Sequence, residues 1–311
     1  GAALFYGDGA ITPAISVLSA IEGIKLVTPA LEQYVLPITL AILFGLFMVQ
    51  QHGTAAISVA FGPITAIWFL VMAAMGLWQM SGDWSVLAAF NPYYGIEFMF
   101  EHGVVAFIVL GAVFLCVTGA EALYADLGHF GKAPIRLAWF ALVFPALVIN
   151  YLGQAALVLR TPEAIENPFY LMVPPALLPF LVGLATMATV IAAQAVITGA
   201  FSMARAAIQL GLLPRLNIVH TSEATSGQIY MPAINWLLLF GVLSFVATFQ
   251  TSENLAAAYG IAVTGAMIVD TVLAVIYAHR GWRWSLWFVL PVAAPFFALE
   301  ATFLMSNLVK L

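Results

Sequence analysis

The chain has 311 residues, of which 64% are hydrophobic and only 7% are charged, and its mean hydropathy is +1.05. A soluble domain averages about 45 to 50% apolar and about 25% charged residues, so this composition predicts an integral membrane protein. The net charge of -5 comes from few ionisable groups and no basic patch is present, which argues against a nucleic-acid partner. The single cysteine, Cys116, excludes an internal disulfide, and no Cys/His spacing fits a transition-metal site.

The apolar residues fall into segments that are each long enough to cross a bilayer as a helix. A helix needs about 20 predominantly apolar residues to cross about 30 Å of hydrocarbon. We therefore expect an all-α integral membrane fold in which residues 1–311 form a single transmembrane domain with nine spans. The expected spans are residues 2–25, 34–51, 59–80, 103–125, 135–159, 176–210, 231–250, 254–278 and 285–308.

The loop charges predict the orientation, because Lys and Arg accumulate on the cytoplasmic side of a membrane. Six of the nine basic residues fall in one alternate set of loops, which we expect to be cytoplasmic. The opposite loops carry six carboxylates that indicate either an acidic outer vestibule, which would concentrate cations, or an ordinary solvated face. These carboxylates are Glu32, Asp83, Glu101, Glu163, Glu166 and Glu253.

The first span contains a carboxylate, Asp8, at membrane depth. A charge there costs roughly 2.5 to 3.5 kcal/mol, so such a residue usually faces a bundle interior, a water-filled path or a partner ion. Pro13 lacks an N–H and leaves the carbonyl of Gly9 available beside the carboxylate. Further polar residues continue the Asp8 side of the helix at spacings of three or four. They are Thr12, Ser16, Ser19 and Glu22.

Such a stripe of mixed oxygens suits a hard monovalent cation that sheds part of its water shell. The alternative is that Thr and Ser hydroxyls bond to carbonyls of their own helix, while Asp8 pairs with a base on a helix that is missing from this chain. Both interpretations stay open at this point.

A second membrane carboxylate, Glu121, follows Thr118 and Gly119 in the fourth span. A glycine beside such a carboxylate is typical of a discontinuous helix, whose unwound carbonyls can coordinate an ion at the midplane. The alternative is a continuous helix in which Gly119 serves close packing. Asp126 and His129, further along, are expected to form a turn and cap at the cytoplasmic mouth.

Three later spans carry weaker signals. Tyr259 sits several residues inside the eighth span, where its hydroxyl either faces inward or belongs to an interfacial belt. Asp270 and Glu300 lie at apolar depth and are proton-relay candidates, although Asp270 also fits a position near the cytoplasmic end. In the sixth span, a row of polar residues either lines a path or holds helices together. This row is Gln194, Thr198 and Ser202.

Several long strings resemble the KUP/HAK/KT family of potassium uptake permeases. They include FYGDGAITPAISVLSAIEG, VTGAEALYADLGHFGKAPIRLAWF, VIAAQAVITGAFSMARAAIQLG and NLAAAYGIAVTGAM, and they occur in order along essentially the whole chain. The resemblance implies the LeuT-like inverted-repeat bundle of the amino acid-polyamine-organocation (APC) superfamily. It also implies that this chain holds about nine of twelve helices and lacks the first two helices, the last helix and a C-terminal domain.

The same resemblance implies secondary active potassium uptake across the bacterial inner (plasma) membrane, as potassium/proton symport with alternating access in a single transport domain. The implied partners are the potassium ion, a proton and membrane lipid; a homodimer stays open, and no cofactor is expected. Carried over residue by residue, the proton-coupling candidates are Asp8, Glu121 and Glu300. The implied potassium ligands are Tyr6, Asp8, Thr12, Ser16, Thr118, Glu121 and Tyr259.

Three other classes of protein remain to be weighed against this one. An amino-acid transporter of the same architecture would need a pocket for an organic substrate, and a channel would need a continuous pore. An intramembrane hydrolase would need a nucleophile, a base and an orienting group, and these do not occur in a recognisable arrangement. We therefore expect a transporter and not an enzyme.

Overall fold

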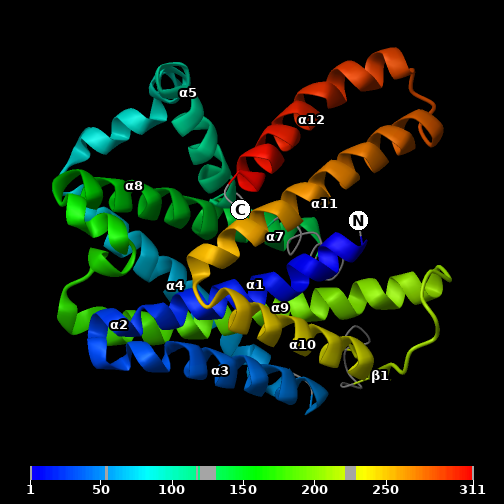
Figure 1. The fold of residues 1–311 in the computed structure, drawn as a ribbon, viewed down its shortest axis with the longest axis horizontal. Helices are drawn as coiled ribbons and strands as arrows, with labels where there is room; N and C mark the ends of the chain where they lie inside the picture. The colour runs from blue at the N-terminus through cyan, green and yellow to red at the C-terminus, as the bar shows by residue number, and fades with distance from the viewer. Residues whose placement is uncertain (1, 53–54, 117, 120–130, 221–228, 310–311) are drawn as a thin grey trace.

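The computed structural model describes residues 2–52, 55–116, 118–119, 131–220 and 229–309 (Figure 1). Within these residues nine helical segments are long and apolar enough to cross a membrane, which confirms the expected all-α membrane fold. A short antiparallel pair of strands, β1 (Val219–His220) and β2 (Ile229–Tyr230), precedes α10. The helices are α1 (Ala2–Glu22), α2 (Ile24–Val27), α3 (Val35–Val49), α4 (Ala55–Met80), α5 (Pro92–Leu115), α7 (Lys132–Ala138), α8 (Phe144–Arg160), α9 (Leu178–Gln209), α10 (Pro232–Phe249), α11 (Ser252–Arg280) and α12 (Leu286–Leu308).

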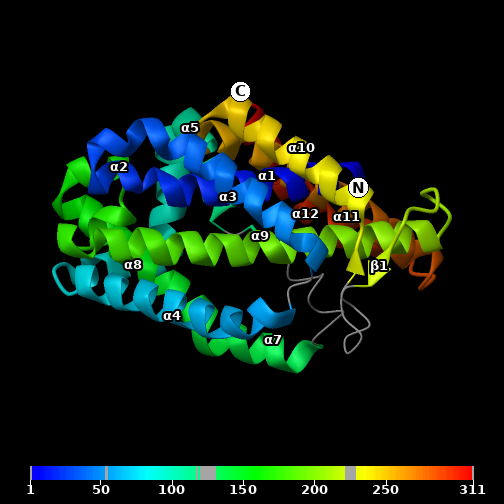
Figure 2. The ribbon, with the colours of Figure 1, turned by 90° about the horizontal axis from the view of Figure 1, so that it is seen from below.

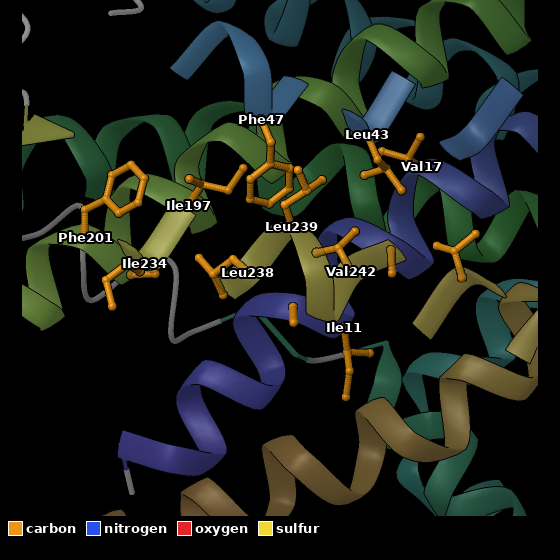
Figure 3. Packing of buried hydrophobic residues seen from close by; sticks show 14 of the residues in the cluster. Ile11, Val17, Leu43, Phe47, Ile197, Phe201, Ile234, Leu238, Leu239 and Val242 are labelled. Atoms are coloured by element: carbon orange, nitrogen blue, oxygen red, sulfur yellow. The ribbon is translucent and has the colours of Figure 1, made fainter. Parts of the chain in front are cut away.

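Helix α1 is the centre of the largest hydrophobic core. It packs against α3, α9, α10 and α11, and half of its apolar stretch is buried, compared with a third or less in every other span. Figure 3 shows this core, in which Ile11 and Val17 lie close to side chains of α3 and α10 such as Leu43 and Val242. The helix that carries Asp8 is therefore the most enclosed span among the described residues.

Helices α4 and α8 form a second packing unit on the opposite side of α9 from α3 and α10 (Figure 2). Their backbones touch where Gly76 faces Gly153: a Cβ added to Gly153 would lie 2.5 Å from Gly76 Cα. Small residues allow such close approach of membrane helices. The core of this unit is separate from the core around α1 and includes Met72, Leu157 and Met172.

Helix α5 is sharply bent and begins earlier than the span expected at residues 103–125. Its N-terminal arm starts at Pro92, where the Asn91 side chain accepts a hydrogen bond from the Tyr93 N–H at 3.1 Å. The bend lies at Gly103, whose φ of 43° and ψ of -102° are non-helical, and Figure 1 shows that α5 changes direction along its length. A positive φ is accessible to glycine at little cost, so this residue permits the turn from the first arm into the membrane span.

Candidate ion-binding site

Asp8 is buried and hydrogen-bonded to another predicted ligand on its own helix. Its exposed fraction is 3%, and Thr12 Oγ1 donates to Asp8 Oδ1 at 2.9 Å. The Thr12 hydroxyl is therefore directed at the carboxylate one turn away, and not at the carbonyl of its own helix that the alternative interpretation required. Two oxygen-bearing groups are brought together inside the most enclosed span.

The outer end of the predicted stripe has a structural role. Ser19 Oγ donates to the Ser16 carbonyl at 3.0 Å, which is the local bonding expected for a helical serine. Glu22 accepts hydrogen bonds from the Ser252 N–H at 2.9 Å and from the Ser252 hydroxyl. Ser252 begins α11, and a carboxylate at a helix N-terminus is stabilised by the unpaired N–H groups there. Ser16 itself is half-buried and remains a predicted ligand.

Tyr6 connects α1 to α9 two residues before Asp8. Its hydroxyl donates to the Ala200 carbonyl at 3.3 Å, and its ring packs against the core around α1. Tyr259 of α11 is half-buried and packs against the same core. Both tyrosines thus lie on helices that contact each other.

The described helical part of the fourth span stops before Thr118 and Gly119, at a point that we call the α5 break. Helix α5 ends at Leu115, and Gly119 has a φ of 105°, which is a conformation that favours glycine. Thr118 Oγ1 donates to the Leu115 carbonyl at 2.9 Å, and Tyr151 of α8 donates to the Cys116 carbonyl at 3.3 Å. A helix C-terminus carries partial negative charge and favours a cation nearby.

Three residues predicted beyond this break lie outside the described residues, so the structure does not place them. They are Glu121, Asp126 and His129.

Glu300 is a further buried carboxylate, located between α11 and α12. Its exposed fraction is 7%, and Thr271 Oγ1 donates to Glu300 Oε1 at 2.7 Å. Its other oxygen, Oε2, has no hydrogen-bond partner in the described part of the chain. Asp270, in contrast, is exposed. Of the two later proton-relay candidates, only Glu300 occupies an enclosed position.

Buried amides were largely missed in the sequence. Gln50 and Gln194 exchange reciprocal side-chain hydrogen bonds between the end of α3 and the middle of α9. Thr198 Oγ1 bonds to the Gln194 carbonyl at 2.9 Å. Of the two interpretations of this row, helix–helix attachment is therefore observed for Gln194, while Thr198 bonds within its own helix. Gln50 could have been found as a polar residue inside an otherwise apolar stretch.

Two cavities lie near the loops that we predicted to face outward. One, of about 400 Å³, is lined by polar groups that include Glu22, Asn150, Glu166 and Tyr170. The other, of about 610 Å³, lies between the last turn of α5 and the first turns of α11, beside Glu253. Burial and the negative charge of Glu22 raise the pKa of Tyr170. Two of the six predicted outer carboxylates, Glu166 and Glu253, thus line cavities.

These features define a multi-pass helical membrane protein with buried carboxylates inside its helical bundle, and ion transporters use buried carboxylates of this kind. Residues 1–311 match the family described as K+ potassium transporter integral membrane domain. The chain therefore belongs to the Kup potassium transporter family, a family of transporters and not of enzymes.

Several curated relatives are similar to the whole chain. A probable potassium transport system protein Kup 1 of Sinorhizobium medicae is 61% identical over 312 residues, covering 100% of this chain and 49% of the relative. Proteins of the same name from Agrobacterium fabrum and Paramagnetospirillum magneticum are 58% and 57% identical, again over 100% of this chain and 49% and 48% of their own lengths. The chain spans about half the length of the curated relatives it matches.

Proposed function

We propose that the full-length protein takes up potassium by secondary active transport, with a proton as the coupled ion and alternating access to one site. Family membership supports this proposal, because the similar relatives are named as probable potassium transport system proteins. We also propose that residues 1–311 form part of a single transport domain with the LeuT-like inverted-repeat architecture of the APC superfamily.

One observation carries the proposal: the Asp8 carboxylate is 3% exposed inside the most enclosed span. A carboxylate taken out of water is costly unless a positive charge or several hydrogen bonds compensate it. The Thr12 hydroxyl on Asp8 Oδ1 adds one such hydrogen bond. A partly dehydrated potassium ion would supply compensating charge and would accept further oxygens as ligands.

The proposed potassium ligands come from three elements. Helix α1 supplies most of them, the break after α5 supplies Thr118, and α11 supplies Tyr259. Glu121 lies beyond the described residues and completes the proposed set. The full set is Tyr6, Asp8, Thr12, Ser16, Thr118, Glu121 and Tyr259.

The coupled proton would be carried by a buried carboxyl group, for which Asp8, Glu121 and Glu300 are the candidates. A cation that arrives beside a carboxyl group favours its charged form and so promotes release of its proton. Ion arrival and proton release can therefore be linked at a single residue. Glu300 differs from Asp8 in lying between α11 and α12, so it would act at a distance from the ligands on α1.

Rubidium uptake by the full-length protein tests the proposal. The variants are Asp8→Asn, which removes the charge, and Asp8→Glu, which keeps it. The matched control is Asp270→Asn, since Asp270 is an exposed carboxylate on α11. We expect Asp8→Asn to lower uptake at least about tenfold, which corresponds to about 1.4 kcal/mol, while Asp8→Glu and Asp270→Asn keep substantial uptake.

The same assay separates the proposed mechanism from its alternatives. Uptake by the wild type should rise at acidic external pH and collapse when an uncoupler removes the proton gradient. Rubidium uptake that does not depend on the proton gradient would reject proton symport and favour a channel. If Asp8→Asn keeps wild-type uptake at every pH, Asp8 is not part of the transport site.

A further inference from the structure

Two neighbouring polar residues near the end of α12 are completely buried. Ser306 and Asn307 are each 0% exposed, whereas the residue before them, Met305, is 55% exposed. Most of α12 presents apolar side chains to the surface, so the buried pair is an exception on this helix. Burying polar groups is unfavourable unless they make specific contacts, and these two residues contact different helices.

Ser306 binds the backbone of α5 in the last two to three turns of that helix. Its hydroxyl donates to the Phe107 carbonyl at 2.6 Å and accepts from the Gly111 N–H at 2.8 Å. In a regular helix these two backbone groups would bond to each other. A side chain inserted at such a bond bends a helix and fixes it in place. Gly111 lies about one turn before Leu115, the last residue of α5, and Phe107 about two turns before it.

Asn307 packs against the backbone of α11 beside Tyr259. A Cβ added to Gly260 would lie 2.5 Å from Asn307 Cγ, so the amide occupies the space that only a glycine leaves open. Its Nδ2 donates to the Phe303 carbonyl at 2.9 Å. Its Oδ1 is buried with no hydrogen-bond partner in the described part of the chain. An apolar side chain of similar size would avoid that unsatisfied oxygen.

We propose that Ser306 and Asn307 are positioning residues that hold the α5 break and the Tyr259 turn of α11 at a fixed separation. Adjacent residues on a helix point about 100° apart, which lets one turn of α12 contact both neighbours. This inference rests on the proposed function, because Thr118 and Tyr259 are proposed potassium ligands carried by those two helices. The pair does not touch the ion and acts through the helices that it joins.

The test measures concentration-dependent rubidium uptake by the full-length protein, together with the amount of folded protein and its thermal midpoint in detergent. The variants are Ser306→Ala and Asn307→Leu. The matched control is Thr302→Ala, because the Thr302 hydroxyl bonds only to the Ala298 carbonyl of its own helix at 2.7 Å. Ser306→Ala should remain folded, since Phe107 and Gly111 can then bond to each other.

We expect both variants to raise the half-saturating rubidium concentration about tenfold or more, as small displacements of ligand groups do. The thermal midpoint of Asn307→Leu should equal or exceed that of the wild type. Thr302→Ala should stay within about twofold of the wild type, as changes away from specific contacts usually do. Gly260→Ala should lose uptake by overlapping Asn307, and Asn307→Ala in the same chain should restore part of it.

Three outcomes would overturn the inference. If Ser306→Ala and Asn307→Leu both keep the half-saturating rubidium concentration of the wild type, the positioning role is rejected and the proposed function is left intact. If Asn307→Ala does not restore uptake to Gly260→Ala, the contact between Gly260 and Asn307, on which the inference depends, is rejected. A wild-type protein that takes up no rubidium rejects the proposed function, and the inference falls with it.

Discussion

Replacing Gly153 by alanine should force α4 and α8 apart. The added Cβ would lie 2.5 Å from Gly76 Cα and 2.7 Å from Gly76 O, whereas ordinary contact begins near 3.4 Å. The helices must therefore separate by about 0.9 Å, because cores this closely packed have no room to absorb the methyl group. Such overpacking typically costs about 1 to 3 kcal/mol. The same movement would carry Tyr151 away from the Cys116 carbonyl, now 3.3 Å from its hydroxyl.

The assay is the thermal midpoint of the purified full-length protein in detergent, with Gly183→Ala as the control. Gly183 lies within α9, and nothing comes within 4 Å of a Cβ added there. Because alanine favours a helix over glycine by about 1 kcal/mol, the control should be neutral or stabilised. Gly153→Ala should lower the midpoint by roughly 2 to 8 °C. Equal midpoints for the two variants would refute the backbone contact between α4 and α8.

Two further predictions concern hydrogen bonds outside the proposed ligand set. Gln50→Leu should destabilise the protein by about 1 to 3 kcal/mol, because it leaves the Gln194 amide unpaired. The double variant Gln50→Leu with Gln194→Leu should recover much of this stability in thermal unfolding. If the stability losses of the two single substitutions simply add in the double variant, the pairing is contradicted. Tyr170→Phe removes the 2.9 Å bond to the Ala20 carbonyl and should cost about 0.5 to 1.5 kcal/mol. The pKa of Tyr170 is raised above its ordinary value of 10.0. The cost of Tyr170→Phe should therefore stay constant below pH 10 and disappear only at higher pH, as the folded-state hydroxyl ionises. A cost that disappears near neutral pH would contradict this prediction.

The number of spans and the end of α5 before Gly119 could be predicted from the sequence because both follow from local chemistry. Apolar length sets the spans, and Gly119 beside an acid signals a break. The bend at Gly103 was missed, since a single glycine in an apolar segment does not reveal whether its φ is positive. The fifth span, expected over 135–159, is confirmed as one span, Lys132–Arg160, but the π-helical turn Trp139–Val143 that joins α7 to α8 within it was not predicted.

Partners across helices could not be predicted, because they depend on how each helix is rotated in the bundle. Thr12 was predicted beside Asp8 from a spacing of four, which holds in any regular helix. Glu300 was recognised as a buried acid, but its partner Thr271 lies on the other arm of the α11–α12 hairpin. Ser306 gave no signal because a serine in a membrane helix usually bonds to its own backbone.

The separation of the hydrophobic cores bears on how access to the site would alternate. The core around α1 draws on α3, α9, α10 and α11, and the second core joins α4, α8 and the outer end of α9. Helix α1 is held to the first group near both ends, by Tyr6 on α9 and by Glu22 on Ser252. One hydrogen bond, from Tyr151 of α8 to the Cys116 carbonyl, joins the α5 break to the second unit. Helix α5 packs on α11 and α12, so the proposed ligands on α1, at the α5 break and on α11 stay together, and relative movement of two well-packed units costs less than movement within either. This division favours a mechanism in which the α4–α8 unit moves against a group that keeps α1, α5 and α11 together, and in which the hydrogen bond from Tyr151 to the Cys116 carbonyl breaks.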